Sequence, residues 1–307
     1  MKIDKKTLWQ ILKTESESHN CEGMAALMVD LLHKSGAQVW RDSLGNVYAV
    51  KGEADVYPCI VAHLDTVHDI TGEDITPVEI GGRVMGVHAS SMEQTGIGGD
   101  DKCGLYAALH CLTSLPSCKV ALFVDEEVGC IGSSSADMDF FQDAAFVLQA
   151  DRRGGRDFVT SIGGLPLSSA EWLAAIKPLL DTHGMTCTAG AMTDVEALRD
   201  NGIGVCVANM SAGYYEPHTR GEYIHLAELS NVCALMLAIC QQHGHKRWKY
   251  SPPKRKRERW GGWRKKAESL DWAPGKNSAS SSAWERWEDD QQATAQADDW
   301  DSWPLKE

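Results

Sequence analysis

The sequence lacks several features that would assign it to a common class of protein. No pair of its 10 cysteines forms a C-x-x-C pattern, so it has no motif typical of a zinc knuckle or a dithiol redox site. No apolar run approaches the roughly 18 residues of a membrane-spanning helix, so no membrane role is expected. The first residues, Met-Lys-Ile-Asp-Lys-Lys, lack the apolar segment of a signal peptide. Reduced thiols and a cytoplasmic location are therefore expected.

Positive charge is scarce except near the C-terminal end. The formal net charge is −13 over 307 residues. Residues 1–245 contain 16 Lys and Arg against 32 Asp and Glu, so this part is acidic and is not expected to bind nucleic acid specifically. Residues 246–307 contain 14 basic and 11 acidic residues. The change of composition predicts a boundary near residue 245.

Residues 246–307 also differ in their apolar content. A basic stretch, 246–266, precedes an acidic stretch, 284–307, and the segment holds eight of the 11 tryptophans. Val, Ile, Leu and Phe are almost absent from it, so it cannot bury enough apolar surface to offset the entropy of ordering. We expect a disordered tail, which either docks on a protein partner through its tryptophans and acids or serves only as a solubilising extension.

Residues 1–245 alternate between apolar runs and amphipathic patterns. Strands are predicted at 46–50, 59–62, 119–124, 145–150 and 203–208, and helices at 5–14, 22–33, 105–115, 168–183, 192–200 and 227–243. This alternation predicts a single α/β domain, a three-layer αβα sandwich with a mixed, mostly parallel central sheet.

Acidic residues and histidines follow these strands. His63-Leu64-Asp65, Glu126-Glu127 and Asp151 each follow a strand, Asp100-Asp101 precedes a helix, and His218 lies in a late loop. Ligands bind beyond the carboxyl ends of strands in open α/β sheets, so these side chains are expected to converge. Crowded carboxylates repel one another and are costly to bury alone. Divalent cations relieve that cost, and histidine with carboxylate suits Zn²⁺, Co²⁺ or Mn²⁺.

These segments, in this order, resemble the co-catalytic zinc metallopeptidases of the M20, M28 and M42 type. The resemblance rests on HLDTV at 63–67, GIGGDDKCG at 96–104, DEEVG at 125–129, the strand-end Asp151, the late His218 and the opening SHNCEGMAALMVDLLHKSGAQV at 18–39. It covers about residues 5–243 and implies a catalytic domain over residues 1–245. It implies an exopeptidase that uses two divalent ions, expected to be Zn²⁺.

The resemblance further implies roles for individual residues. The implied metal ligands are His63, Asp100, Glu127, Asp151 and His218. Asp100 would bridge the two ions, because the family pattern is Asp-x-Lys and Asp100 lies two positions before Lys102. Asp101 is the second candidate. Asp65 would orient His63, and Glu126 would be the general base for water whose pKa a metal lowers to about 7.

Three functions remain open at this level. An aminopeptidase or di- or tripeptidase acting on peptides would share its site with an amidohydrolase (deacylase) acting on N-acyl amino acids. A non-catalytic binding protein could use the same scaffold, recruited through the tail.

Only 66 residues separate Asp151 from His218, so no inserted lid domain is expected. Thr193 and Asp194 open a predicted helix, either as a plain N-cap or, by the family resemblance, as a Thr-Asp pair that lies near the substrate.

Overall fold

The computed structural model describes residues 2–67 and 75–250. Most of the predicted tail, residues 251–307, therefore lies outside the described residues. The described part continues past the predicted boundary at 245. Trp248 is buried, and its backbone N–H donates to the carbonyl oxygen of Ala145 while its carbonyl accepts from Cys206. Residues 246–250 thus pack with the body of the protein.

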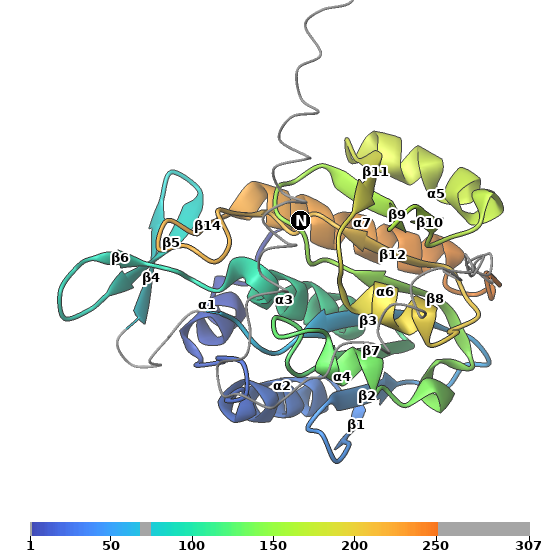
Figure 1. Ribbon diagram of the computed structural model, residues 1–307, viewed down its shortest axis with the longest axis horizontal. Helices are drawn as coiled ribbons and strands as arrows, with labels where there is room; N and C mark the ends of the chain where they lie inside the picture. Colours follow the sequence, from blue (N-terminus) through green and yellow to red (C-terminus); the bar gives the residue numbers. More distant parts are fainter. Residues whose placement is uncertain (1, 68–74, 251–307) are drawn as a thin grey trace, which may run out of the picture. The chain divides into compact units, whose positions relative to one another are not determined.

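A nine-stranded sheet forms the middle layer (Figure 1). Its strands are β1 (Gln38–Arg41), β2 (Val47–Lys51), β3 (Tyr57–His63), β7 (Cys118–Phe123), β8 (Ala144–Gln149), β9 (Asp157–Ile162), β10 (Leu165–Pro166), β11 (Thr186–Gly190) and β12 (Val207–Met210). The order is β1-β2-β7-β3-β8-β12-β9-β10, with β11 paired to β9. The central strands β7, β3, β8 and β12 run parallel, whereas β2 and β9 pair antiparallel to β7 and β12.

Helices cover both faces of this sheet. Successive residues of a strand point to opposite faces, so one strand contributes apolar side chains to the cores on both sides. Ile60 and Ala62 of β3 join one apolar core, and Cys59 and Val61 join the other. The first core packs against α1 (Lys5–Lys13), α2 (Glu22–Lys34), α3 (Gly99–Ser114), α5 (Ala170–Thr182) and α7 (Leu226–His243). The second packs against the 3₁₀ helix η1 (Met138–Phe141) and α6 (Asp194–Asp200), which contacts α4 (Ile131–Ser134). The predicted three-layer α/β fold is confirmed.

A second, smaller sheet was not predicted. It consists of β4 (Ile75–Ile80), β5 (Arg83–His88), β6 (Gln94–Thr95), β13 (Tyr214–Tyr215) and β14 (Tyr223–His225). It projects at the left of Figure 1. Around His218 the sequence predicted only a loop, because strands of two and three residues show no periodicity. Pairing of β14 with β5 brings the loop that carries His218 beside the segment that leads into α3.

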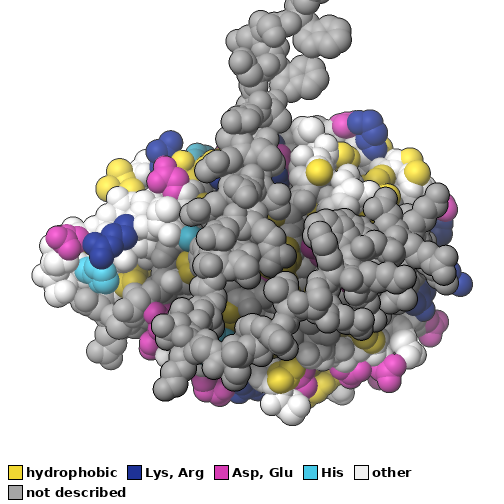
Figure 2. Space-filling model, viewed as in Figure 1, with side chains coloured by type: hydrophobic (Ala, Val, Ile, Leu, Met, Phe, Trp, Pro, Cys, Tyr) yellow, Lys and Arg dark blue, Asp and Glu magenta, His cyan; other side chains and the backbone are white. Residues whose placement is uncertain are grey.

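The surface of the described residues is of mixed charge. On the face in Figure 2, Lys and Arg side chains alternate with Asp and Glu side chains around the visible rim. Among the described helices, none is both long and apolar enough to cross a membrane.

Replacing Trp172 by Ala should strongly destabilise the fold. Trp172 is fully buried in α5, with ring centroids 5.6 Å from Phe146 and 6.2 Å from Phe158. The cavity left behind should lower the free energy of unfolding by about 3–5 kcal/mol. Urea unfolding followed by circular dichroism measures the change. The control Met192→Ala removes a 63% exposed side chain and should stay within about 0.5 kcal/mol of wild type. Equal effects of the two substitutions would contradict this account.

Candidate metal centre

Three neighbouring parallel strands end in site residues. β3 ends at His63, Glu126 and Glu127 follow β7, and Asp151 follows β8. These strands are adjacent in the order β7-β3-β8, so their carboxyl ends meet at the edge where α/β sheets bind ligands. Asp100 comes from the start of α3. The remaining histidine, His218, comes from the loop between β13 and β14.

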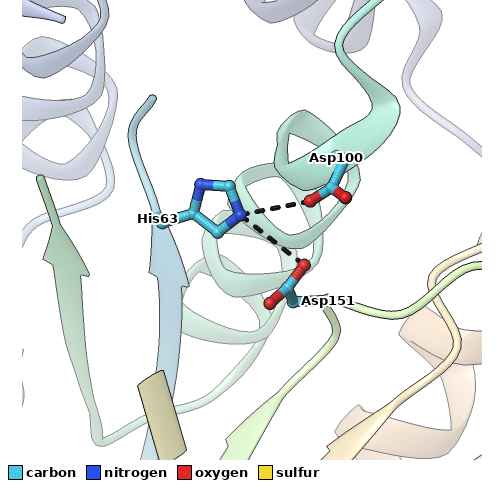
Figure 3. Close-up of side chains that lie close together, drawn as sticks. All are labelled: His63, Asp100 and Asp151. Atoms are coloured by element: carbon cyan, nitrogen blue, oxygen red, sulfur yellow. Dashed lines mark hydrogen bonds and ion pairs between the residues drawn. The ribbon is translucent and has the colours of Figure 1, made fainter. Parts of the chain in front are cut away.

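His63 is buried, and both of its ring nitrogens face oxygen atoms. Figure 3 shows the nitrogen that faces Asp100 and Asp151. Nδ1 lies 2.9 Å from the backbone carbonyl oxygen of Asp65. A carbonyl oxygen only accepts, so Nδ1 carries the hydrogen and Nε2 of the neutral ring presents a lone pair. Nε2 lies 3.2 Å from Asp100 Oδ1 and 3.6 Å from Asp151 Oδ1. This is the usual arrangement of a histidine that binds a metal.

Asp100 stands between the two histidines. Its Oδ1 faces His63 Nε2 at 3.2 Å, and its Oδ2 faces His218 Nε2 at 3.4 Å. His218 Nε2 also lies 3.0 Å from Glu127 Oε1. The potential ligand atoms therefore form two groups, each with its atoms within 4.8 Å of one another: His63, Asp100 and Asp151, and Asp100, Glu127 and His218. Asp100 is common to both groups.

Asp101, the second candidate for the bridging position, makes other contacts. It is fully buried, and Oδ1 accepts from the backbone N–H of Gly104 at 2.9 Å. Its Oδ2 accepts from the backbone N–H of His63 at 3.3 Å. Asp101 thus ties the end of β3 to the first turn of α3, and it belongs to neither ligand group.

Asp65 contacts more than the expected histidine. Its Oδ1 lies 3.4 Å from His63 Nδ1, but the same carboxylate accepts a shorter bond, 2.9 Å, from the backbone N–H of Glu126. It also accepts from Ser18 Oγ at 2.8 Å and from the backbone N–H of Glu127 at 3.3 Å. The backbone oxygen of Asp65 orients the ring of His63, while its carboxylate holds the turn that carries both glutamates.

The pKa shifts of three site carboxyl groups, those of Glu126, Glu127 and Asp151, have burial as their common cause. Burial raises the pKa of Glu126 well above its usual value, opposed by His63 and reinforced by Asp151. Burial and the charge of Asp100 raise the pKa of Glu127, and they raise the pKa of Asp151 to about 7. The site thus holds more carboxylates than its own residues can neutralise. That excess, with imidazole and carboxylate donors grouped together, fits divalent cations.

Sequence analysis missed most of the side chains that hold Asp151. Thr193 Oγ1 lies 2.8 Å from Asp151 Oδ2, Gln149 Nε2 donates to the same oxygen at 3.2 Å, and Tyr214 OH donates to Oδ1 at 3.3 Å. Thr193 occupies the N-cap position of α6, but its side chain makes no capping hydrogen bond. The predicted N-cap position is therefore confirmed, but the side chain bonds to Asp151 and does not cap the helix. The resemblance of Thr193-Asp194 to the family's Thr-Asp pair was the sequence signal for a position of Thr193 near the site.

Solved peptidase structures share this fold. The aminopeptidase PepT from Bacillus cereus ATCC 10987 matches with a TM-score of 0.63 and 15% identity, over 77% of this chain and 97% of that chain. A tripeptidase from Staphylococcus aureus subsp. aureus Mu50 matches with a TM-score of 0.62 and 15% identity, over 78% and 98%. An aminopeptidase from the archaeon Desulfurococcus kamchatkensis matches with a TM-score of 0.62 and 15% identity, over 78% and 96%.

The chain therefore shares the fold of these two aminopeptidases and this tripeptidase, as the resemblance of its motifs predicted. No protein-family model matches the sequence, and no curated protein sequence is significantly similar to it. Identity of 15% establishes a shared fold, and the function has to be argued from the site.

Metal-free protein should lose stability as the pH rises above the ordinary carboxyl range. Burial raises the pKa of Asp194 from 3.8 to about 6. A raised pKa means that the folded state holds the proton more tightly, so this stabilisation is complete below pH 3.8 and is lost as the pH passes 6. In chelator-treated protein, Asp194→Asn should remove up to about 3 kcal/mol of that loss. Urea unfolding at stepped pH measures it.

A surface substitution supplies the control for this titration. Asp55 is exposed, so Asp55→Asn should leave the pH dependence of stability as in wild type. If Asp194→Asn gave the same pH profile as Asp55→Asn, the buried carboxyl would not be the source of the effect.

Proposed function

We propose that this chain is a metal-dependent exopeptidase, an aminopeptidase or a di- or tripeptidase, that hydrolyses a peptide bond with metal-activated water. The observation that carries the proposal is the position of Asp100, shared by two groups of ligand atoms. His63, Asp100 and Asp151 would hold one divalent cation, and Asp100, Glu127 and His218 the other. Their donor atoms suit Zn²⁺, with Co²⁺ or Mn²⁺ as alternatives.

The residues of the chain divide the remaining work. When bound, the cations supply Lewis-acid charge that acidifies water and polarises a substrate carbonyl. Glu126 is buried next to Glu127 and belongs to neither ligand group. In the proposed reaction it takes the proton of the attacking water and returns it to the leaving amine. Asp65 keeps Glu126 in place through the bond to its backbone N–H.

Metal content and substrate choice test the proposal together. We expect purified protein to contain two equivalents of a transition metal, and a chelator to abolish its hydrolysis of free dipeptides. Free dipeptides should be cleaved and N-blocked dipeptides should not. Cleavage of the N-acyl compounds instead would favour the alternative, an amidohydrolase. Bound metal without turnover of either class would favour the non-catalytic binding protein.

Replacing Glu126 by Gln should separate metal binding from catalysis. The amide cannot accept the proton, so kcat should fall by about 10²–10⁴-fold. Metal content, measured by atomic emission, should stay at the wild-type level because Glu126 is not a proposed ligand. The matched control Glu53→Gln alters an exposed glutamate and should keep full activity. Unchanged turnover in Glu126→Gln would remove it from the role of base.

The partner and location of the protein are also proposals. Peptides are the proposed substrates, and the tryptophan-rich tail remains a proposed docking segment for a protein partner. A reducing compartment such as the cytoplasm is supported by the cysteines, because all 10 are free and nine of them are buried.

A further inference from the structure

Glu222 is a fully buried carboxylate with no role in the proposed reaction. It lies in the segment that carries His218, immediately before β14. Its two oxygens accept hydrogen bonds from three backbone N–H groups at the start of α3. Oε2 accepts from Ile97 at 3.0 Å and from Gly98 at 2.7 Å, and Oε1 accepts from Asp100 at 3.2 Å.

The start of α3 needs an acceptor from elsewhere in the chain. Gly98, in the N-cap position, has a φ of +66° and supplies no side-chain cap. Asp100 and Asp101 have non-helical backbone angles inside the first turn. The first N–H groups of a helix lack intrahelical partners, and its N-terminus favours negative charge. Glu222 meets both needs from a position 122 residues further along the chain.

Close packing leaves this turn little freedom to move relative to Glu222. A Cβ atom on Gly99 would lie 2.7 Å from Tyr214 Cβ and 3.2 Å from Glu222 Oε1. The backbone at residue 99 therefore touches the segment that runs from β13 to β14. That segment bears His218 between its two points of contact, so one stretch of chain fixes the place of His218 and of the turn that bears Asp100.

We propose that Glu222 is a positioning residue for the metal pair, holding the backbone of Asp100 so that its carboxylate lies between the two histidines. The inference rests on the proposed two-metal site. An aspartate side chain is short, so its carboxylate follows any movement of its backbone. The distances of 3.2 and 3.4 Å from Asp100 to the two histidines then depend on the bonds that Glu222 accepts.

Glutamine cannot replace Glu222 in this role. Its side chain has one acceptor oxygen, and its NH₂ group would face a backbone N–H that also needs an acceptor. Loss of residues that orient metal ligands typically weakens metal binding by about 10–100-fold. A residue with a purely structural role would lower stability without changing how the metal is bound.

The experiment compares metal binding by full-length wild type and Glu222→Gln after removal of metal. Zn²⁺ is titrated by calorimetry, and the visible spectrum of bound Co²⁺ reports its coordination. We expect affinity to fall by about 10–100-fold in Glu222→Gln and the Co²⁺ spectrum to change. The control is Glu228→Gln. Glu228 accepts from Tyr215 OH at 2.6 Å in the same region of the chain, and it should bind both metals like wild type.

The possible outcomes separate the inference from the proposed function. If wild type binds fewer than two ions, both are overturned. If wild type binds two ions and Glu222→Gln matches it in affinity and spectrum, only the inference is overturned. Should Glu222→Gln fail to fold without metal, Glu222→Asp decides, because it keeps the charge but is one methylene shorter. It should bind metal more weakly than wild type, and unchanged binding would overturn the inference.

Discussion

Crowding of negative charge around one short side chain, that of Asp100, is the constraint on which the rest of the site depends. Two further carboxylates, Glu127 and Asp151, share ligand groups with it, and Glu126 lies buried nearby. Burial and mutual repulsion raise the pKa of all three of these neighbours. A protein keeps such an arrangement only when something positive is bound there or when the groups stay protonated. The proposed cations satisfy this requirement, and the proposed chemistry uses the same charge.

The fold holds this arrangement through its backbone. Three of the segments that bear proposed ligands are each held by a buried carboxylate that accepts backbone N–H groups. Asp65 holds the turn of Glu126 and Glu127, Asp101 holds the N–H of His63, and Glu222 holds the turn of Asp100. When the backbone is held in place, packing has to fix only the few torsion angles of each side chain. The site can then keep its geometry before a ligand binds.

Each of the two sheets positions some of the residues of the site. The nine-stranded sheet brings His63, Glu127 and Asp151 to one edge, because β7, β3 and β8 are neighbours and run parallel. The small sheet places His218 opposite them by pairing β14 with β5. Pattern analysis predicted the first contribution, since buried strands and their acidic ends are local features. It missed the second sheet, in which β13 and β14 are only two and three residues long and the pairing of β14 with β5 joins residues more than a hundred positions apart in the chain.

The sequence by itself determined the layered α/β fold and the residues proposed to bind metal. Periodicity and the residue types at strand ends can be recognised in short stretches of sequence. The motifs also occur along the chain in the same order as in the family they resemble. Only the tertiary structure decided that Asp101 holds the backbone N–H of His63, that Thr193 contacts Asp151, and that Glu222 accepts the backbone N–H groups at the start of α3. Those contacts join segments that are far apart in the chain, and no sequence pattern within either segment indicates the other. A buried carboxylate is placed by whichever backbone N–H groups the folded chain leaves without partners, and these are defined only once the chain is folded.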